Sequence, residues 1–228
     1  MTLANNPRYQ ALSAAREQIM TGATKRVPEA AMASQARALR LWNGKTLFVR
    51  NDPQLNLLFD LAVFDPVGGH SRALDRELRN RTDPPGSEAA QIAAAAPDAA
   101  FTLFVVEEEH PQGGVMARDL LRENRFTLWD GFLSRPEVRG CAFAGRLMQL
   151  PEAAMTCIAT CPITDEIMQV LQGFPVPEGP PPQFLPPLTP LEPAELAVLR
   201  EAAAAPGFAP KLFNAALDLG LFGERPDR

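Results

Sequence analysis

Apolar side chains recur along this chain in two patterns, and the change from one to the other divides the sequence. In the first hundred residues the spacing is helical. It is clearest after Asp52-Pro53, where a broad apolar stripe follows at i, i+3, i+4, i+7 and i+8. The stripe consists of Leu55, Leu58, Phe59, Ala62 and Val63. Asn6-Pro7, Ser71 and Ser87 supply further helix starts. Residues 1–100 are therefore predicted to be a helical region.

From Phe101 onward the apolar residues follow strand alternation. Phe101, Leu103 and Val105 alternate with Thr102, Phe104 and Val106, so both faces of this strand are largely apolar. Closely spaced turn sequences then separate further short strands. Residues 101–163 are predicted to form a small antiparallel five-stranded β-barrel of the SH3 or OB kind. The predicted core of the helices and strands contains Leu58, Phe59, Val63, Leu103, Val105, Phe126 and Leu147.

The last third returns to helices around a proline-rich segment. Thr164 is a good N-cap for a short helix, and two more helices are predicted near 193–205 and 210–219. Between them, residues 175–193 hold nine prolines in nineteen positions, which predicts an extended strap. Such a strap either offers a ligand to an SH3-type module or clamps its own domain. Residues 164–228 complete an α+β fold in which helices frame the barrel on both sides.

The charge of the chain is unevenly distributed. Its 228 residues carry a net charge of −5, yet residues 1–50 carry +6 and residues 51–228 carry −11. A basic segment is typical of nucleic-acid contacts. A helical arm that packs on the acidic remainder of its own chain would also carry such a positive charge, and this second interpretation is favoured.

Cysteine usage and hydropathy restrict the setting. The three cysteines, Cys141, Cys157 and Cys161, are few and odd in number, which does not suit a disulfide framework, so a reducing cytoplasm is predicted. No run approaches the roughly 18 apolar residues of a membrane helix, so no membrane partner is expected. On a strand, Cys157 and Cys161 would lie about 13 Å apart, too far for one tetrahedral zinc. Neither a metal nor a cofactor is predicted.

Catalytic candidates are limited to carboxylates and one histidine. Asp60 and Asp65 flank the end of the main helix, His70 follows a glycine turn, and Asp119 closes a barrel strand. Converging carboxylates bind hard cations or perform acid–base chemistry. The alternative is structural, because aspartates before turns cap them and pair with neighbouring arginines.

A second group of residues would suit ligand binding on the barrel. Trp129 lies beside Asp130, with Arg118 and Arg146 on neighbouring predicted strands. Aromatic rings among arginines can stack on nucleic-acid bases. The same residue types also pack together on ordinary protein surfaces, and this is the favoured interpretation.

Several segments between residues 55 and 151 resemble a family of uncharacterised bacterial proteins that often end in a SEC-C zinc knuckle. They are Leu58-Phe59-Asp60, Phe101 to Glu107, Met116 to Leu121, Leu128-Trp129-Asp130, Ser134 and Gly145-Arg146-Leu147. The knuckle's cysteine and histidine ligands are absent here, and Arg122-Glu123-Asn124 replaces the family's threonine-glycine turn. The resemblance supports the barrel and implies no mechanism.

The function predicted from these observations is a non-catalytic binding or adaptor module with a protein partner. A nucleic-acid module that uses the basic arm and the arginines of the barrel ranks second. An enzyme built on the carboxylates ranks third.

Overall fold

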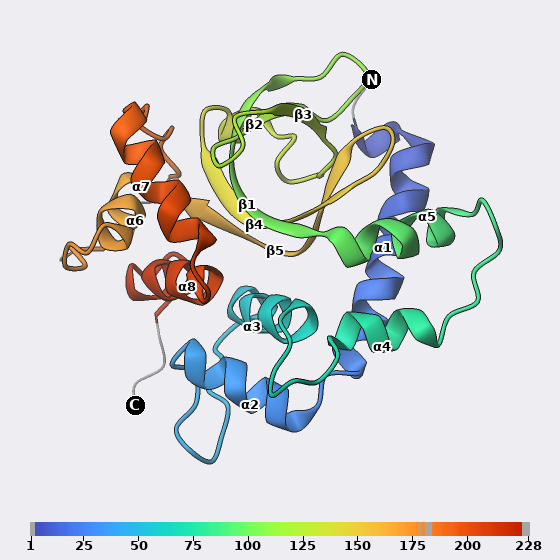
Figure 1. The fold of residues 1–228 in the computed structure, drawn as a ribbon. Coiled ribbons are helices and arrows are strands. Elements are labelled where there is room, and N and C mark those ends of the chain that lie inside the picture. Colours follow the sequence, from blue (N-terminus) through green and yellow to red (C-terminus); the bar gives the residue numbers. More distant parts are fainter. Residues whose placement is uncertain (1–2, 178, 181–183, 225–228) are drawn as a thin grey trace.

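A closed sheet flanked by helices forms the protein (Figure 1). The computed structural model describes residues 3–177, 179–180 and 184–224. The five strands hydrogen-bond in the order β1-β2-β3-β5-β4 and close into a ring. The predicted mixture of helices around a small closed sheet is confirmed.

The N-terminal helices begin where the sequence offers caps. They are α1 (Pro7–Lys25), α2 (Glu29–Ala38), α3 (Asp52–Phe64), α4 (Ala73–Arg79) and α5 (Glu88–Ala95), with short 3-10 turns at Leu3–Asn5 and Ala96–Asp98. Asn6 caps α1 by accepting hydrogen bonds from two backbone amides, and Asn51 and Ser87 cap α3 and α5 with one each. Helix α4 begins after Arg72 rather than after Ser71.

The ring is built from β1 (Ala100–Glu109), β2 (Val115–Asp119), β3 (Arg125–Leu128), β4 (Ala142–Gln149) and β5 (Ala154–Ile163). A 3-10 turn, Pro136–Val138, lies between β3 and β4. Four neighbouring pairs are antiparallel, but β3 and β5 meet in parallel at Leu128 and Ala154. The wholly antiparallel barrel predicted from the turns is therefore wrong at this closure. The contact joins strands that are distant in the sequence, where no turn fixes direction.

Alternation along the strands separates the inside of the ring from its outside. On β4, Phe143 and Leu147 join the apolar cluster inside the ring. Ala144 and Met148, on the other face, pack against the helices. Helix α3 packs on β5 and on α8 from that outer side (Figure 1). The sheet is thus apolar on both faces, as the pattern of β1 predicted.

The predicted core is partly confirmed. Leu58, Val63, Leu103 and Leu147 are buried. Phe59, Val105 and Phe126 are only partly buried. For Phe59 the reason is that the buried stripe of α3 is centred on its neighbours.

The C-terminal part lies against the ring and α3. It contains α6 (Asp165–Leu171), α7 (Pro193–Ala204) and α8 (Phe208–Asp218), with Thr164 capping α6. The described part of the proline-rich strap lies along its own chain: the amide of Leu188 donates to the Gly140 carbonyl at 3.0 Å, and Thr189 binds Asp165. Within 175–193, positions 178 and 181–183 lie outside the described residues.

Candidate functional site

A buried ion cluster joins helix α3 to strand β4. Asp60 is fully buried, and its Oδ2 accepts a hydrogen bond from Nε of Arg146 at 2.9 Å. Asp65, the C-cap of α3, accepts from Nη2 of the same arginine at 2.5 Å. The rings of Phe64 and Phe101 lie 5.0 and 5.8 Å from the guanidinium carbon. One arginine therefore joins two carboxylates in an aromatic setting on the outer face of the ring.

Burial controls the protonation of this cluster. Desolvation raises the pKa of Asp60 to about 6, against the lowering effect of Arg146, and the charge of Asp65 adds to the increase. Burial lowers the pKa of Arg146, but the two carboxylates outweigh it and raise the pKa above its ordinary value. Arg146 stays charged, and Asp60 is the group that titrates near neutrality.

One oxygen of Asp60 is poorly satisfied. Its Oδ1 is buried and has no hydrogen-bond partner of good geometry among the described residues. The backbone amide of Ala159 lowers the Asp60 pKa slightly, which indicates a weak contact at most. An ionised carboxylate with an unmet oxygen is expensive in a dry interior, and this favours the protonated form.

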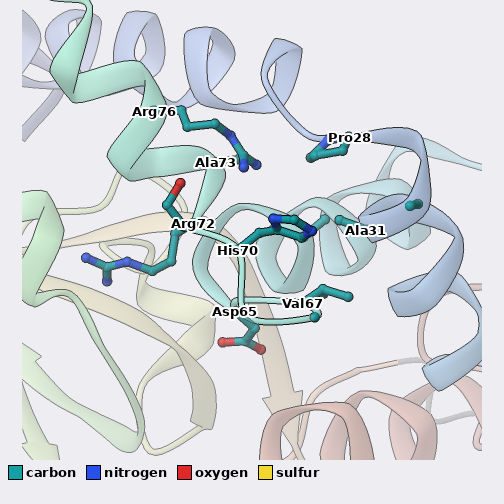
Figure 2. A pocket seen from close by; sticks show the side chains of 12 residues that line it. Pro28, Ala31, Asp65, Val67, His70, Arg72, Ala73 and Arg76 are labelled. Atoms are coloured by element: carbon teal, nitrogen blue, oxygen red, sulfur yellow. The ribbon is translucent and has the colours of Figure 1, made fainter.

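A pocket of about 350 Å³ lies beside Asp65, among α2, the α3–α4 loop and α4. We call it the α4 pocket. Figure 2 shows Arg76 and His70 on one side and Pro28 and Ala31 on the other, with Asp65 at the base. The remaining lining is largely small and apolar, including Ala62, Val67 and Ala73. The pocket therefore combines apolar walls with a few charged groups.

Arg76 is the unusual member of this pocket. Its Nε is buried without a hydrogen-bond partner among the described residues. The neighbouring arginines are engaged: Arg72 binds Asp75 at 2.8 Å and the Pro97 carbonyl at 2.9 Å, and Arg79 binds Ser71. Figure 2 shows the Arg72 side chain directed away from the pocket. The Arg76 guanidinium is thus available to an anionic group.

A second pocket, of about 380 Å³, lies on the other side of Asp65. We call it the α8 pocket, because the start of α8 and the end of α7 form one wall. Its polar lining is Gln35, Asp65 and Arg146, and its apolar lining includes Phe101, Leu121 and Phe208. Asp65 lines both pockets, so the ion cluster separates them.

The predicted catalytic residues are only partly brought together. Asp60 and Asp65 converge on Arg146, and His70 shares the α4 pocket with Asp65. No hydrogen bond joins His70 to Asp65 within the described part of the chain. Asp119 is opposite Phe104 in the strand register and so faces the inner side of the sheet, where it accepts from Thr102 and from the amides of its own turn.

The four predicted ligand-binding residues form no common surface. Trp129 is buried, and its ring meets Tyr9 edge to face at 6.4 Å. Asp130 caps the following turn and accepts from the hydroxyl of Thr156. Arg118, on β2, pairs with Glu107 on β1 at 2.9 Å. Of the four, Arg146 alone lines one of the two pockets described above.

Two pocket residues, Arg76 and Gln35, were not predicted as site residues. Gln35 leaves no signal in the sequence, because it is a single polar residue in an alanine-rich helix. Arg76 is one of three arginines within eight positions after the Asp65 turn, a concentration of charge that points weakly to an anion.

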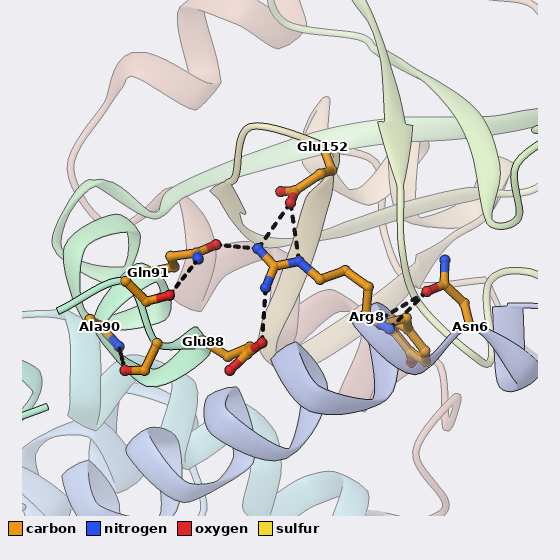
Figure 3. A network of polar contacts seen from close by, with 9 residues as sticks. Asn6, Arg8, Glu88, Ala90, Gln91 and Glu152 are labelled. Carbon is orange, nitrogen blue, oxygen red and sulfur yellow. Dashed lines mark hydrogen bonds and ion pairs between the residues drawn. The ribbon is translucent and has the colours of Figure 1, made fainter. Parts of the chain in front are cut away.

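The basic N-terminal segment uses its charge within the chain. Arg8 lies between Glu88, at 3.1 Å, and Glu152, at 2.9 Å (Figure 3). Arg26 pairs with Glu77 at 2.5 Å, and Arg40 pairs with Asp218. These contacts confirm that the basic segment docks on the acidic body.

The cysteines are buried and free of disulfides. Burial raises the pKa of the Cys157 and Cys161 thiols far above the ordinary value, so both are inert thiols. Over the described ranges no three His, Cys, Asp or Glu side chains are placed to hold a metal ion. Nor does any helix in those ranges have the length and apolar character needed to cross a membrane.

The fold and the site together describe a mixed α+β protein with two pockets beside a buried ion cluster. Comparison with protein families places residues 5–172 in a family of unknown function, DUF7986. The chain belongs to that family, which confirms the resemblance to an uncharacterised family. No curated protein and no solved structure matches the chain. The α4 pocket is built wholly within the matched residues, whereas the α8 pocket also uses residues beyond them.

Proposed function

We propose that this chain is a non-catalytic binding protein and that its ligand is a compact apolar molecule with an anionic group. The ligand would occupy the α4 pocket. The observation that carries the proposal is the buried Nε of Arg76, which has no partner among the described residues although it lines an apolar pocket of about 350 Å³. A buried donor without an acceptor is costly, and an anionic ligand supplies that acceptor.

The chemistry of the lining supports a ligand of this class. Pro28, Ala31 and Val67 offer apolar contact but no donor or acceptor from their side chains. Arg76 offers donors, and His70 adds a second polar group at the same side (Figure 2). The volume lies within the usual range for small-molecule sites, about 300–1,000 Å³.

Binding is favoured over catalysis because the carboxylates already have structural roles. Asp60 holds Arg146, Asp65 caps α3 and holds the same arginine, and Asp119 secures a turn. General acid–base chemistry requires a group within hydrogen-bonding reach of a substrate. Of these three aspartates, only Asp65 lines the α4 pocket or the α8 pocket.

The proposal is tested with 1-anilinonaphthalene-8-sulfonate, an apolar aromatic anion whose fluorescence rises on binding. We expect saturable, one-to-one binding to the full chain. Arg76→Gln should weaken it by roughly 10-fold or more, as expected for a lost charge-assisted hydrogen bond. The matched control is Arg79→Gln, on the same helix but bonded to Ser71, and it should bind like the wild type.

A second variant tests the walls rather than the charge. Ala31→Leu would fill part of the α4 pocket with Arg76 unchanged, and we expect it to weaken the dye as well. If the dye bound equally to wild type, Arg76→Gln and Ala31→Leu, all with unaltered circular dichroism, the α4 pocket would not be the site.

The strand order gives the nucleic-acid alternative its own support. A five-stranded ring closed by a parallel β3–β5 contact supports an OB-type barrel rather than an SH3 type, and OB-folds bind oligonucleotides on strands 2 and 3. Here, however, Arg118 and Arg125 on those strands pair with Glu107 at 2.9 and 2.7 Å. Their charge is largely neutralised, so we rank this function second.

The setting and the partner also remain proposals. Three free, buried cysteines support a reducing compartment such as the cytoplasm. A protein partner that responds to the bound ligand would make the chain an adaptor.

A further inference from the structure

The α8 pocket holds polar groups whose hydrogen-bonding capacity is unused. Arg146 is 8% exposed and Gln35 is 9% exposed, so both are more than nine-tenths buried. Nε and Nη2 of Arg146 are engaged, but Nη1 has no partner among the described residues. Over the same residues, neither the Gln35 amide group nor Oδ2 of Asp65 has a hydrogen-bond partner. All three residues line the pocket, so these free atoms can bind a ligand there.

The free atoms supply one donor and one acceptor on two side chains that are bonded to each other. Oδ1 of Asp65 is bonded to Nη2 of Arg146 at 2.5 Å, which holds the carboxylate and the guanidinium together. Their second atoms, Oδ2 and Nη1, remain for a ligand. A ligand that carries an ammonium group and a carboxylate on one carbon can bind both side chains at once. Its ammonium would bind Asp65 and its carboxylate would bind Arg146. The Gln35 amide can bind either group.

Charge balance favours a zwitterion over a simple ion. Arg146 already faces two carboxylates, Asp60 and Asp65. A simple anion would add a third negative charge to this arginine, and a simple cation would lie against its positive charge. A zwitterion adds no net charge, so the protonation of Asp60 is left undisturbed.

The rest of the pocket is apolar and aromatic. Phe101 and Phe208 meet edge to face at 6.2 Å, and Leu121 and Ala203 complete the wall. A volume of about 380 Å³ leaves room for a side chain beside the polar groups. We propose that the α8 pocket binds a free α-amino acid with an apolar side chain, held through Asp65, Arg146 and Gln35. This site is separate from the α4 pocket and does not depend on the function proposed for it.

Isothermal titration calorimetry of the full chain with three probes of similar shape tests which charged groups the ligand needs. The probes are L-leucine, L-leucinamide, which lacks the carboxylate, and 4-methylpentanoate, which lacks the amine. We expect L-leucine to bind with a Kd of about 1 mM or tighter and the other two at least tenfold more weakly. Equal binding of L-leucinamide would make this a cation site, equal binding of 4-methylpentanoate would make it an anion site, and no binding of L-leucine would exclude it. Each of these results overturns the proposal.

Variants that leave the ion cluster intact locate the site. Ala203→Leu fills the apolar wall, and we expect it to weaken L-leucine at least tenfold. Ala204→Leu, at the next and exposed position of α7, is the matched control and should bind like the wild type. Equal binding to both variants would place the amino acid elsewhere. Because neither residue lines the α4 pocket, binding of the anionic dye should be unchanged, so failure of one proposal is distinguishable from failure of the other.

Discussion

The two faces of the ring differ in what they bury. Inside it, Phe104, Phe143 and Leu128 pack with other apolar side chains, and Asp119 at the inner side is held by Thr102 and Arg122. On the outer face, Arg146 lies against Phe64 and Phe101 and pairs with Asp60 and Asp65. Both pockets lie on that outer side, against the helices.

Under the proposed function, this difference separates a scaffold from a binding layer. A largely apolar interior contributes mainly to stability. A buried ion cluster contributes little net stability but determines which side chains pair with one another. Desolvation opposes the charges of the ion cluster on the outer face, but that cluster separates the two pockets. Substitutions inside the ring should reduce folding, and substitutions at the pocket walls should reduce binding.

The largest effect on stability is expected inside the ring. Phe143→Ala removes a side chain that is 1% exposed, and we expect the free energy of unfolding to fall by about 3–5 kcal/mol in denaturant melts. The control is Phe184→Ala, where the side chain is 85% exposed and a change below about 0.5 kcal/mol is expected. Similar losses in the two variants would mean that the ring interior is not the main core.

Breaking the ion cluster should lower the free energy of unfolding slightly less than Phe143→Ala does, and this loss should depend on pH. Arg146→Met leaves Asp60 buried without its partner, and we expect a loss of about 3 kcal/mol at pH 7.5. At pH 5 the loss should be smaller, because Asp60 can then take up a proton. Arg118→Met, which breaks a more exposed pair with Glu107, should cost less than about 1 kcal/mol at both pH values. A pH-independent loss in Arg146→Met would show that Asp60 is not the cause.

Asp60 itself should make stability fall as pH rises. The folded chain keeps the Asp60 proton up to about pH 6, whereas the unfolded chain releases it near 3.8. Between these values the folded state binds more protons, so the free energy of unfolding decreases with pH. Relative to Asp60→Asn, the wild type should lose about 2–3 kcal/mol between pH 4 and pH 7. A constant difference between the two proteins would contradict the raised pKa.

The smallest effect is expected with nucleic acid. Because the basic segment and the β2–β3 arginines are paired internally, binding to mixed-sequence DNA near physiological salt should be weaker than the usual nonspecific level of about 10⁻⁴–10⁻⁶ M. Fluorescence anisotropy measures this. Replacing Glu107 and Glu108 with glutamine would free Arg118 and Arg125 and should strengthen binding more than the same change at Glu17 and Glu29. Micromolar binding by the wild type, lost on removal of residues 1–50, would contradict internal docking.

The sequence predicted the elements better than it predicted the site. Periodicity and caps located α3, α5, α6 and β1, because these signals are local. The parallel closure of β3 on β5 and the pairing of Arg146 with Asp60 join residues far apart in the chain, and local patterns do not specify such contacts. One signal was present: Asp60 lies among apolar residues of α3, between Phe59 and Leu61, where a charged residue that is buried needs a partner.

Residue-resolved NMR tests the division between scaffold and binding layer most directly. In ¹H–¹⁵N spectra of the full chain titrated with 1-anilinonaphthalene-8-sulfonate, the largest amide shifts should fall at Ala31, Val67, His70 and Arg76, on the helix side. Val115 and Thr127, on β2 and β3, should stay unchanged. Largest shifts on β2 and β3, with the α4 pocket unaffected, would contradict the account and move binding to the ring.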